Sequence, residues 1–146
     1  MKKNQLLIAA AMCSAVAAML HVGCIVFGGD WYRIMGAGEE MARMAEAGDS
    51  YPTIVTSLIV ALLMISACYA LSGAGVIFKL PFLRLALCTI AAVFLLRSVA
   101  FIPLMPLFPE NGLLFWIISS AICFFIGALY ALGAYRSWGY LGRGVF

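Results

Sequence analysis

Charged side chains are scarce in this sequence. Of its 146 residues only nine are basic and six acidic, whereas 66% are hydrophobic and the mean hydropathy is +1.10. Soluble domains usually contain about 25% charged residues, so too few charges are present here to cover a surface that faces water. A net charge of +3, spread over several loops, also gives no basic patch of the kind that binds nucleic acid. We therefore expect an integral membrane protein without a nucleic-acid partner.

Paired cysteines and metal-ligand clusters are also missing. The five cysteines include no C-x-x-C pair, and the single histidine, His21, has no second ligand at metal-binding spacing. These absences exclude a C-x-x-C redox site and a Cys/His metal site, and they argue against haem. Phosphate-binding loops, H-E-x-x-H sites and nucleophile elbows are absent as well. We expect no metal and no cofactor, and we interpret the cysteines as small packing residues.

Long uncharged runs dominate what is present. A helix needs about 20 apolar residues to cross a membrane, and it must be a helix because the bilayer core offers no water to the backbone. The sequence contains no linker or repeat that would divide it. It therefore predicts an all-α fold, a single membrane domain over 1–146, in which four transmembrane helices form a bundle. The spans are predicted near residues 5–27, 52–72, 82–103 and 113–135.

The charges predict how this bundle is oriented. Six basic residues lie on one side of the predicted membrane without any acid: Lys2, Lys3, Lys79, Arg84, Arg136 and Arg143. The other side holds every acid of the chain, together with two arginines: Asp30, Arg33, Glu39, Glu40, Arg43, Glu46, Asp49 and Glu110. Because basic loops stay in the cytoplasm, we expect both termini to be cytoplasmic, in a bacterial inner membrane.

The first extracytoplasmic loop contains its own predicted helix. Gly36 and Gly38 interrupt the chain, and the segment 39–47 (EEMARMAEA) then has helical spacing, with Glu39 and Arg43 placed to form an i, i+4 pair. Methionines and alanines share one face of this segment. We expect a short amphipathic helix that lies on the outer membrane interface.

One histidine and one arginine lie well inside the predicted spans. His21 lies six residues before the outer end of the first span, and Arg97 lies six residues before Pro103 at the end of the third. At 1.5 Å per residue, both are about 9 Å deep. An ionisable residue inside the membrane is a candidate functional group, because burying its charge is costly. Several structural explanations remain open for each of the two. Arg97 could snorkel to the interface or pair with an acid of the 39–49 segment, and His21 could be hydrogen-bonded within the bundle.

Other polar residues are predicted to surround this pair. The neighbouring spans contribute hydroxyl groups at the same end, and two adjacent acids of the loop helix could lie at the mouth of the bundle. The predicted ligand-binding set is His21, Arg97, Thr56, Ser57, Ser119, Ser120, Glu39 and Glu40. The two glutamates are otherwise an ordinary solvated face, and they belong to the site only if their helix folds over the bundle as a lid.

We expect this site to bind a small amphipathic or anionic ligand, a lipid being one example, in an outward-facing polar pocket. The protein would then be a binding or transport-accessory protein, in which Arg97 pairs with the anion. Two alternatives stay open: an intramembrane enzyme acting on a lipid-linked substrate, which needs a carboxylate near His21, and a structural subunit of a membrane complex. The expected partners are membrane lipid and either a second copy or another membrane protein.

The stretch HVGCIVFGGDWYRIMGAGEEMARMAEAGDSYP (21–52), followed by YALSGAG, LPFLR and LLRSVA, resembles small four-span inner-membrane proteins of bacteria for which no activity is known. The resemblance implies a fold and a compartment but no chemistry. The chain lacks the acid in the first span that is typical of small multidrug-resistance exporters. It also lacks the Arg/Asn/Glu pattern of membrane glutathione transferases.

Overall fold

The computed structural model describes residues 3–142, and every regular element among them is helical. The predicted all-α class is therefore confirmed. The elements are α1 Gln5–Phe27, α2 Gly29–Ile34, α3 Glu39–Glu46, α4 Tyr51–Gly73, α5 Leu83–Val99, α6 Phe101–Leu104, the short 3₁₀ helix η1 Met105–Leu107, α7 Leu113–Arg136 and α8 Trp138–Leu141.

Three of these helices, α1, α4 and α7, are long and apolar enough to cross a membrane. Their bounds agree with three of the predicted spans to within a residue at each end. The third predicted span, 82–103, differs because it does not form one straight helix. Helix α5 ends at Val99, and the chain continues as α6 and η1 after a bend of 51°. Counting this bent pair as one span gives four.

Proline explains this bend. Pro103 has no backbone N–H, and its ring clashes with the carbonyl four residues earlier, which is that of Val99. The regular hydrogen bonds of α5 therefore end at Val99, and the chain turns there. Pro106 and Pro109 then keep the following helical segment short. The sequence showed these prolines, and the structure shows that the first of them already redirects the chain.

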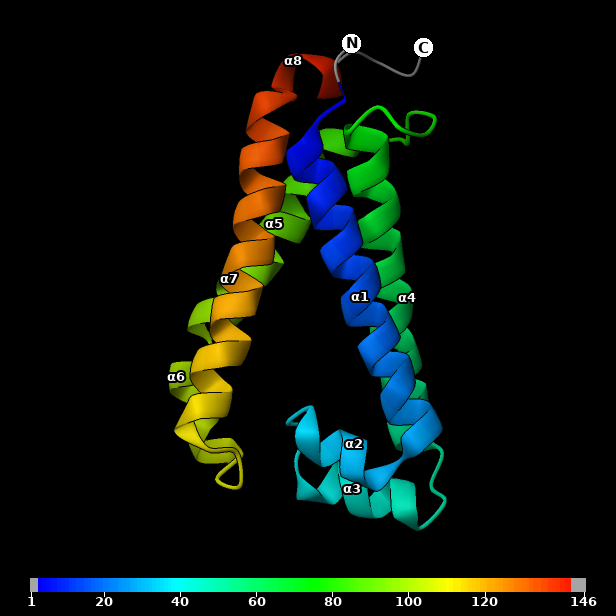
Figure 1. Cartoon of the computed structure of the whole chain (residues 1–146), viewed down its shortest axis with the longest axis vertical. Coiled ribbons are helices and arrows are strands. Elements are labelled where there is room, and N and C mark those ends of the chain that lie inside the picture. Colours follow the sequence, from blue (N-terminus) through cyan, green and yellow to red (C-terminus); the bar gives the residue numbers. More distant parts are fainter. Residues whose placement is uncertain (1–2, 143–146) are drawn as a thin grey trace.

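The long helices form two arms. Helix α1 packs along α4, and α5 packs along α7 (Figure 1). The arms meet where α1 begins and α8 lies, here called the α8 end, and they diverge toward α2, α3 and α6, here called the cap end (Figure 1).

The core of the molecule lies at the α8 end, where the arms touch. Leu7 of α1, Leu87 of α5 and Tyr130 of α7 are all fully buried there. Small residues allow the close approach, since a Cβ added at Gly73 would lie 2.7 Å from Leu87 and 2.9 Å from Leu7. Asn4 joins the two arms by donating hydrogen bonds to the Gly133 carbonyl and to Ser137. The arms are therefore held together at one end.

At the cap end, the α2–α3 cap (residues 29–46) is fastened to the α1–α4 arm. Cys24 of α1, Tyr32 of α2 and Ala42 of α3 form a second buried cluster. The Thr56 hydroxyl of α4 donates a 3.1 Å hydrogen bond to the Tyr32 oxygen. Helix α2 was not predicted, whereas the helix predicted over 39–47 forms as α3.

Candidate functional site

Arg97 is the centre of the candidate site. It lies near the end of α5, where its Nη2 donates a 3.2 Å hydrogen bond to the Ser119 hydroxyl of α7. The guanidinium carbon lies 5.8 Å from the centre of the Trp116 ring, within the range of a cation–π contact. Its other terminal nitrogen, Nη1, is buried and has no hydrogen-bond partner within residues 3–142.

No carboxylate balances the charge of Arg97. All six acids of the chain lie within the described residues, and none of them is within ion-pair distance of this guanidinium. The predicted alternative, a pair between Arg97 and an acid of the 39–49 segment, does not form. Arg33 of α2 takes that place, so the cation of α5 is left with neutral neighbours from α7.

An apolar groove begins beside Arg97. It has a volume of about 620 Å³ and runs between α4 and α5 from Phe82 toward the cap end, where Cys123 of α7 and Arg97 lie. Arg97 is the one charged residue among the described residues that line it. The lining is Ile59, Leu62, Leu63, Ile65, Ser66, Tyr69, Phe82, Leu85, Ala86, Thr89, Ile90, Val93, Phe94, Arg97 and Cys123.

Helix α7, which Arg97 contacts through Ser119 and Trp116, contains two further buried polar atoms. Trp116 is 2% exposed and Ser120 is 8% exposed. The Trp116 Nε1 and the Ser120 Oγ have no hydrogen-bond partner within the described part of the chain. Arg97 Nη1, Trp116 Nε1 and Ser120 Oγ are thus the buried side-chain polar atoms that lack a partner within the described residues. Buried polar groups are usually paired.

His21 makes its hydrogen bond within its own helix rather than to Arg97. Its Nδ1–H donates a 2.7 Å hydrogen bond to the Ala17 carbonyl, one turn earlier in α1. No hydrogen bond connects His21 with Arg97 in the residues that the structure describes. This arrangement matches the predicted alternative in which the bundle itself satisfies the histidine.

The predicted hydroxyl residues have different positions. Ser119 contacts Arg97, whereas Ser120 is buried and its hydroxyl has no hydrogen-bond partner within the described residues. Thr56 is buried and fastens the cap through Tyr32, while Ser57 is exposed on α4 and lies outside the groove lining. Of the predicted hydroxyl residues, Ser119 is therefore the one that the structure brings to Arg97. Trp116 and Cys123 were not predicted, since an indole and a lone thiol in an apolar run look like ordinary packing residues.

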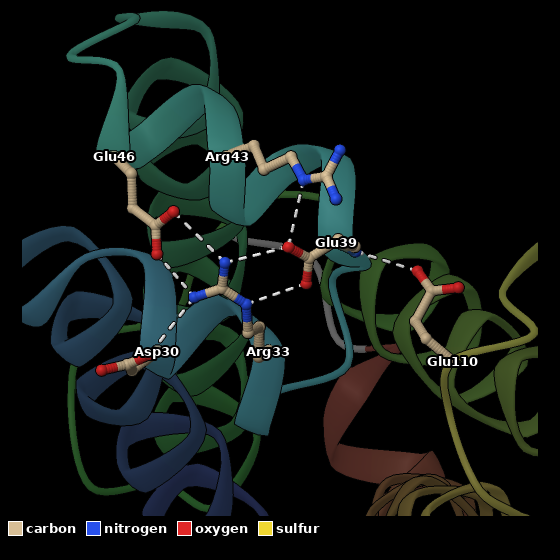
Figure 2. A network of polar contacts seen from close by, with 6 residues as sticks. All are labelled: Asp30, Arg33, Glu39, Arg43, Glu46 and Glu110. Atoms are coloured by element: carbon tan, nitrogen blue, oxygen red, sulfur yellow. Dashed lines mark hydrogen bonds and ion pairs between the residues drawn. The ribbon is translucent and has the colours of Figure 1, made fainter.

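The acids of the cap surround Arg33 instead (Figure 2). Its guanidinium binds Glu39 at 2.8 Å and Asp30 at 3.2 Å, and it also contacts Glu46. Arg43 pairs with Glu39 at 3.2 Å, as the i, i+4 spacing predicted. The hydrogen bond from Arg33 lowers the pKa of Glu39 to about 2 and lowers the pKa of Glu46, and the two carboxylates raise the pKa of Arg33. This cluster holds α2 against α3.

The cap also touches the α5–α7 arm. The backbone N–H of Glu39 donates a 2.9 Å hydrogen bond to the Glu110 carboxylate (Figure 2), and Asn111 donates one of 3.1 Å to the Gly36 carbonyl. Gly36 has φ +72°, and the Phe115 ring leaves no space for a Cβ there. Glu40 and Glu110 line a smaller pocket of about 370 Å³ at this contact. The cap therefore connects the diverging arms.

No protein-family model matches the chain, and neither a curated protein nor a solved structure matches it. The function proposed next therefore depends on the groove, on Arg97 and on the chemistry of the residues around them.

Proposed function

We propose that this protein is a four-span membrane protein that binds a small amphipathic anion in the groove between α4 and α5. The anion pairs with Arg97, and the apolar tail lies along the groove toward Phe82. One observation carries the proposal. A cation without a carboxylate partner lies at one end of an otherwise apolar groove.

The proposed topology uses the bent pair of α5 and α6–η1 as the fourth span. Lys79 and Arg84 contact the carbonyls of Tyr140 and Trp138 at the α8 end, whereas the acidic cap lies at the other end of the molecule (Figure 1). Because basic loops stay in the cytoplasm, the proposal places the α8 end and both termini in the cytoplasm of a bacterial cell. The cap then lies outside, with the methionines of α3 near the outer membrane interface.

The membrane environment explains why Arg97 matters more than the groove. Lipid tails are as apolar as the groove lining, so a tail gains little by moving from the bilayer into the groove. The lining is open to lipid, since Leu62, Leu85 and Val93 expose 55%, 67% and 59% of their surface. A guanidinium within a membrane is costly, about 2.5–3.5 kcal/mol at the centre of a span, and the half-buried Arg97 near the end of α5 bears part of that cost. A bound anion offsets that cost and therefore gives the groove its selectivity.

Binding is favoured over the two alternatives. An enzyme would need a carboxylate near His21 or near the bound substrate, and within residues 3–142 the acids cluster around Arg33 or lie at the outer edge of the cap. A purely structural subunit would have no need of an open groove that ends at an unpaired cation. His21 is not required by the proposal, because its Nδ1–H is used within α1.

Quenching of Trp116 fluorescence tests the proposal. The chain has three tryptophans, so the double variant W31F/W138F leaves Trp116, which lies against Arg97, as the single fluorophore. Phosphatidylglycerol with brominated acyl chains should quench it more strongly than brominated phosphatidylcholine at equal amounts. In the same background, R97Q should remove this preference, while R136Q, which removes an exposed arginine at the far end of α7, should leave it unchanged.

A second variant protects the test against a folding defect in R97Q. Ala86 lines the groove, and A86F would fill it without touching Arg97. A61F adds the same ring at an exposed position of α4 outside the groove lining and serves as the matched control. The proposal predicts reduced quenching in A86F and normal quenching in A61F. Equal quenching by the two lipids in the parent, or full quenching in A86F, would refute it.

A further inference from the structure

Three aromatic rings lie between Arg97 and the cap. Building on the proposed function, we infer that Trp116 is a positioning residue for Arg97: together with Phe108 and Phe115 it closes the way from the guanidinium to the surface at the cap end. These three residues are called the aromatic cover below. Arg97 stays open to the groove, from which an anion reaches it.

An arginine near the end of a span needs such a restraint to bind a ligand inside the membrane. Its long stem normally lets the guanidinium reach the nearer membrane surface, where water solvates the charge. Arg97 lies only two residues before the end of α5 at Val99. A guanidinium that reached water would gain little from an anion in the groove. The groove therefore binds an anion only if the guanidinium is held beside it.

Two contacts with α7 hold the guanidinium. Nη2 donates a 3.2 Å hydrogen bond to the Ser119 hydroxyl, and the guanidinium carbon lies 5.8 Å from the centre of the Trp116 ring. Trp116 is three residues nearer than Ser119 to the start of α7, which lies at the cap end (Figure 1). Helix side chains also lean toward the start of their helix. The Trp116 ring is therefore on the cap side of the guanidinium.

The two phenylalanines continue the aromatic cover as far as the cap. The centres of the Phe108 and Phe115 rings lie 6.4 Å and 5.6 Å from that of Trp116. The Phe115 ring lies against Gly36, and a Cβ added at Gly38 would lie 3.2 Å from the Phe108 ring. These contacts leave Trp116 only 2% exposed. The rings thus form a continuous series of contacts from Arg97 to the loop before α3.

The two cavities of this region agree with that arrangement. Arg97 lines the groove of about 620 Å³, and no member of the aromatic cover is among the described residues that line it. Phe108 lines the pocket of about 370 Å³ at the cap contact, whose described lining includes neither Arg97 nor Trp116. Arg97 therefore borders the groove, whereas the cap pocket ends at the Phe108 ring.

The aromatic cover strengthens the pairing of Arg97 with an anion in two ways. Two charges attract each other more strongly where water is excluded, because the effective dielectric constant is lower there. The face of the Trp116 ring also attracts the cation without accepting a hydrogen bond from it in the plane of the guanidinium. The N–H groups that do not bind Ser119 thus remain for the oxygens of an anion.

Chemical modification of arginine tests whether Arg97 is covered. The full chain in nanodiscs of phosphatidylcholine alone is treated with p-hydroxyphenylglyoxal, a water-soluble reagent for guanidinium groups, and peptide mass spectrometry gives the rate at each arginine. The parent should react slowly at Arg97 and fast at Arg43, whose side chain is 75% exposed. W116A should raise the rate at Arg97 by about tenfold, as expected for the loss of one desolvated cation–π contact.

Three further variants control this measurement. W116F keeps an aromatic ring and should react at Arg97 as slowly as the parent. W138A removes a tryptophan that contacts Arg84 at the α8 end, and it should leave the rate at Arg97 unchanged. F108A removes the ring next to Trp116 and decides the question if W116A does not fold. The inference is refuted if the parent reacts equally fast at Arg97 and Arg43, or if the deciding variant keeps the parent rate at Arg97.

Lipid binding separates this inference from the proposed function. In native mass spectrometry, W116A should lose the parent's preference for dioleoyl phosphatidylglycerol over dioleoyl phosphatidylcholine, whereas W116F should keep it. An undiminished preference in W116A would show that Trp116 does not position Arg97 for binding. Equal binding of the two lipids by the parent would refute the proposed function, and it would do so whatever the modification rates are, because these are measured without any anionic lipid.

Discussion

The backbone N–H of Glu39 donates a 2.9 Å hydrogen bond to the carboxylate of Glu110, which follows 71 residues later. This bond joins the cap to the arm that carries Arg97. A second bond, from Asn111 to the Gly36 carbonyl, strengthens the same contact. The arms diverge toward this end (Figure 1), so these two bonds limit how far the α1–α4 arm and the α5–α7 arm can move apart there.

Loss of both bonds should release the cap from the α5–α7 arm. In the double variant E110A/N111A, the distance between nitroxide labels at Ala47 and Leu114, measured by electron–electron double resonance, should become longer and more widely distributed. Both labelled positions are exposed. E40A, which removes a neighbouring exposed acid, should keep the parent distribution. An unchanged distribution in the double variant would show that the cap is held by other contacts.

The Arg33 cluster should make the cap sensitive to acid. Its hydrogen bond to Glu39 lowers the pKa of that carboxyl from its ordinary value of 4.5 to about 2. The ionised form is therefore favoured in the folded cap, and its stabilising effect is complete above about pH 4.5. The effect is lost as the pH falls from there to about 2.

Fluorescence of Trp31, which stacks on Phe27 beside the cap, can follow this change in a W116F/W138F background. The parent should show a transition in the acidic range. E39Q should shift or abolish it, whereas E40Q should not. Identical transitions in the parent and in E39Q would contradict the role given to Glu39.

The junction of the arms depends on a buried hydrogen bond between Ser14 of α1 and Tyr130 of α7. Their oxygens lie 2.8 Å apart, and both residues are fully buried. Y130F keeps the ring and leaves the serine hydroxyl unpaired, which should lower the free energy of unfolding by about 0.5–2 kcal/mol. Unfolding in mixed detergent and dodecyl sulfate measures this change. Y135F, at an exposed position of the same helix, should have little effect.

The contact between Thr56 and Tyr32 should determine how firmly the cap is attached to α4. T56V keeps the shape of the side chain and removes the hydroxyl that donates to Tyr32. We expect faster backbone hydrogen exchange in α2 and α3 but unchanged exchange in α7. T53V, which alters an exposed threonine one turn earlier, is the control. Equal protection of the cap in T56V and T53V would show that the hydrogen bond contributes nothing there.

The positions of the long helices were predictable because hydropathy is a local property. Helices α1 and α7 begin and end close to the ends of the uncharged runs. In a bilayer the backbone N–H and C=O groups of each run must form hydrogen bonds with one another, which a helix provides. The bend after Val99 is local as well. Pro103 was visible, but whether a proline kinks a span or ends it depends on the helices packed around it.

The sequence also placed Ser119 near Arg97 and predicted the helix that forms as α3. It predicted the pair between Glu39 and Arg43 but not the acids that surround Arg33. In the predicted topology Arg33 and Arg97 both lie on the side of the membrane that holds the acids. In the structure, only Arg33 of these two forms ion pairs with them. Whether an ion pair forms depends on the direction in which each side chain points around its helix axis, as well as on the depth of the residue in the membrane.

By itself, then, the sequence determined the helical class, the long apolar helices and the presence of a cation within one of them, because each follows from residues close together in the chain. Only the tertiary structure decided that His21 and Arg97 bind different partners, that the cap bridges two diverging arms, and that Arg97 lies at one end of an apolar groove. Spacing along a chain predicts depth in a membrane. The rotation of each helix, and therefore which side chains meet, is decided by packing between helices that are far apart in the sequence.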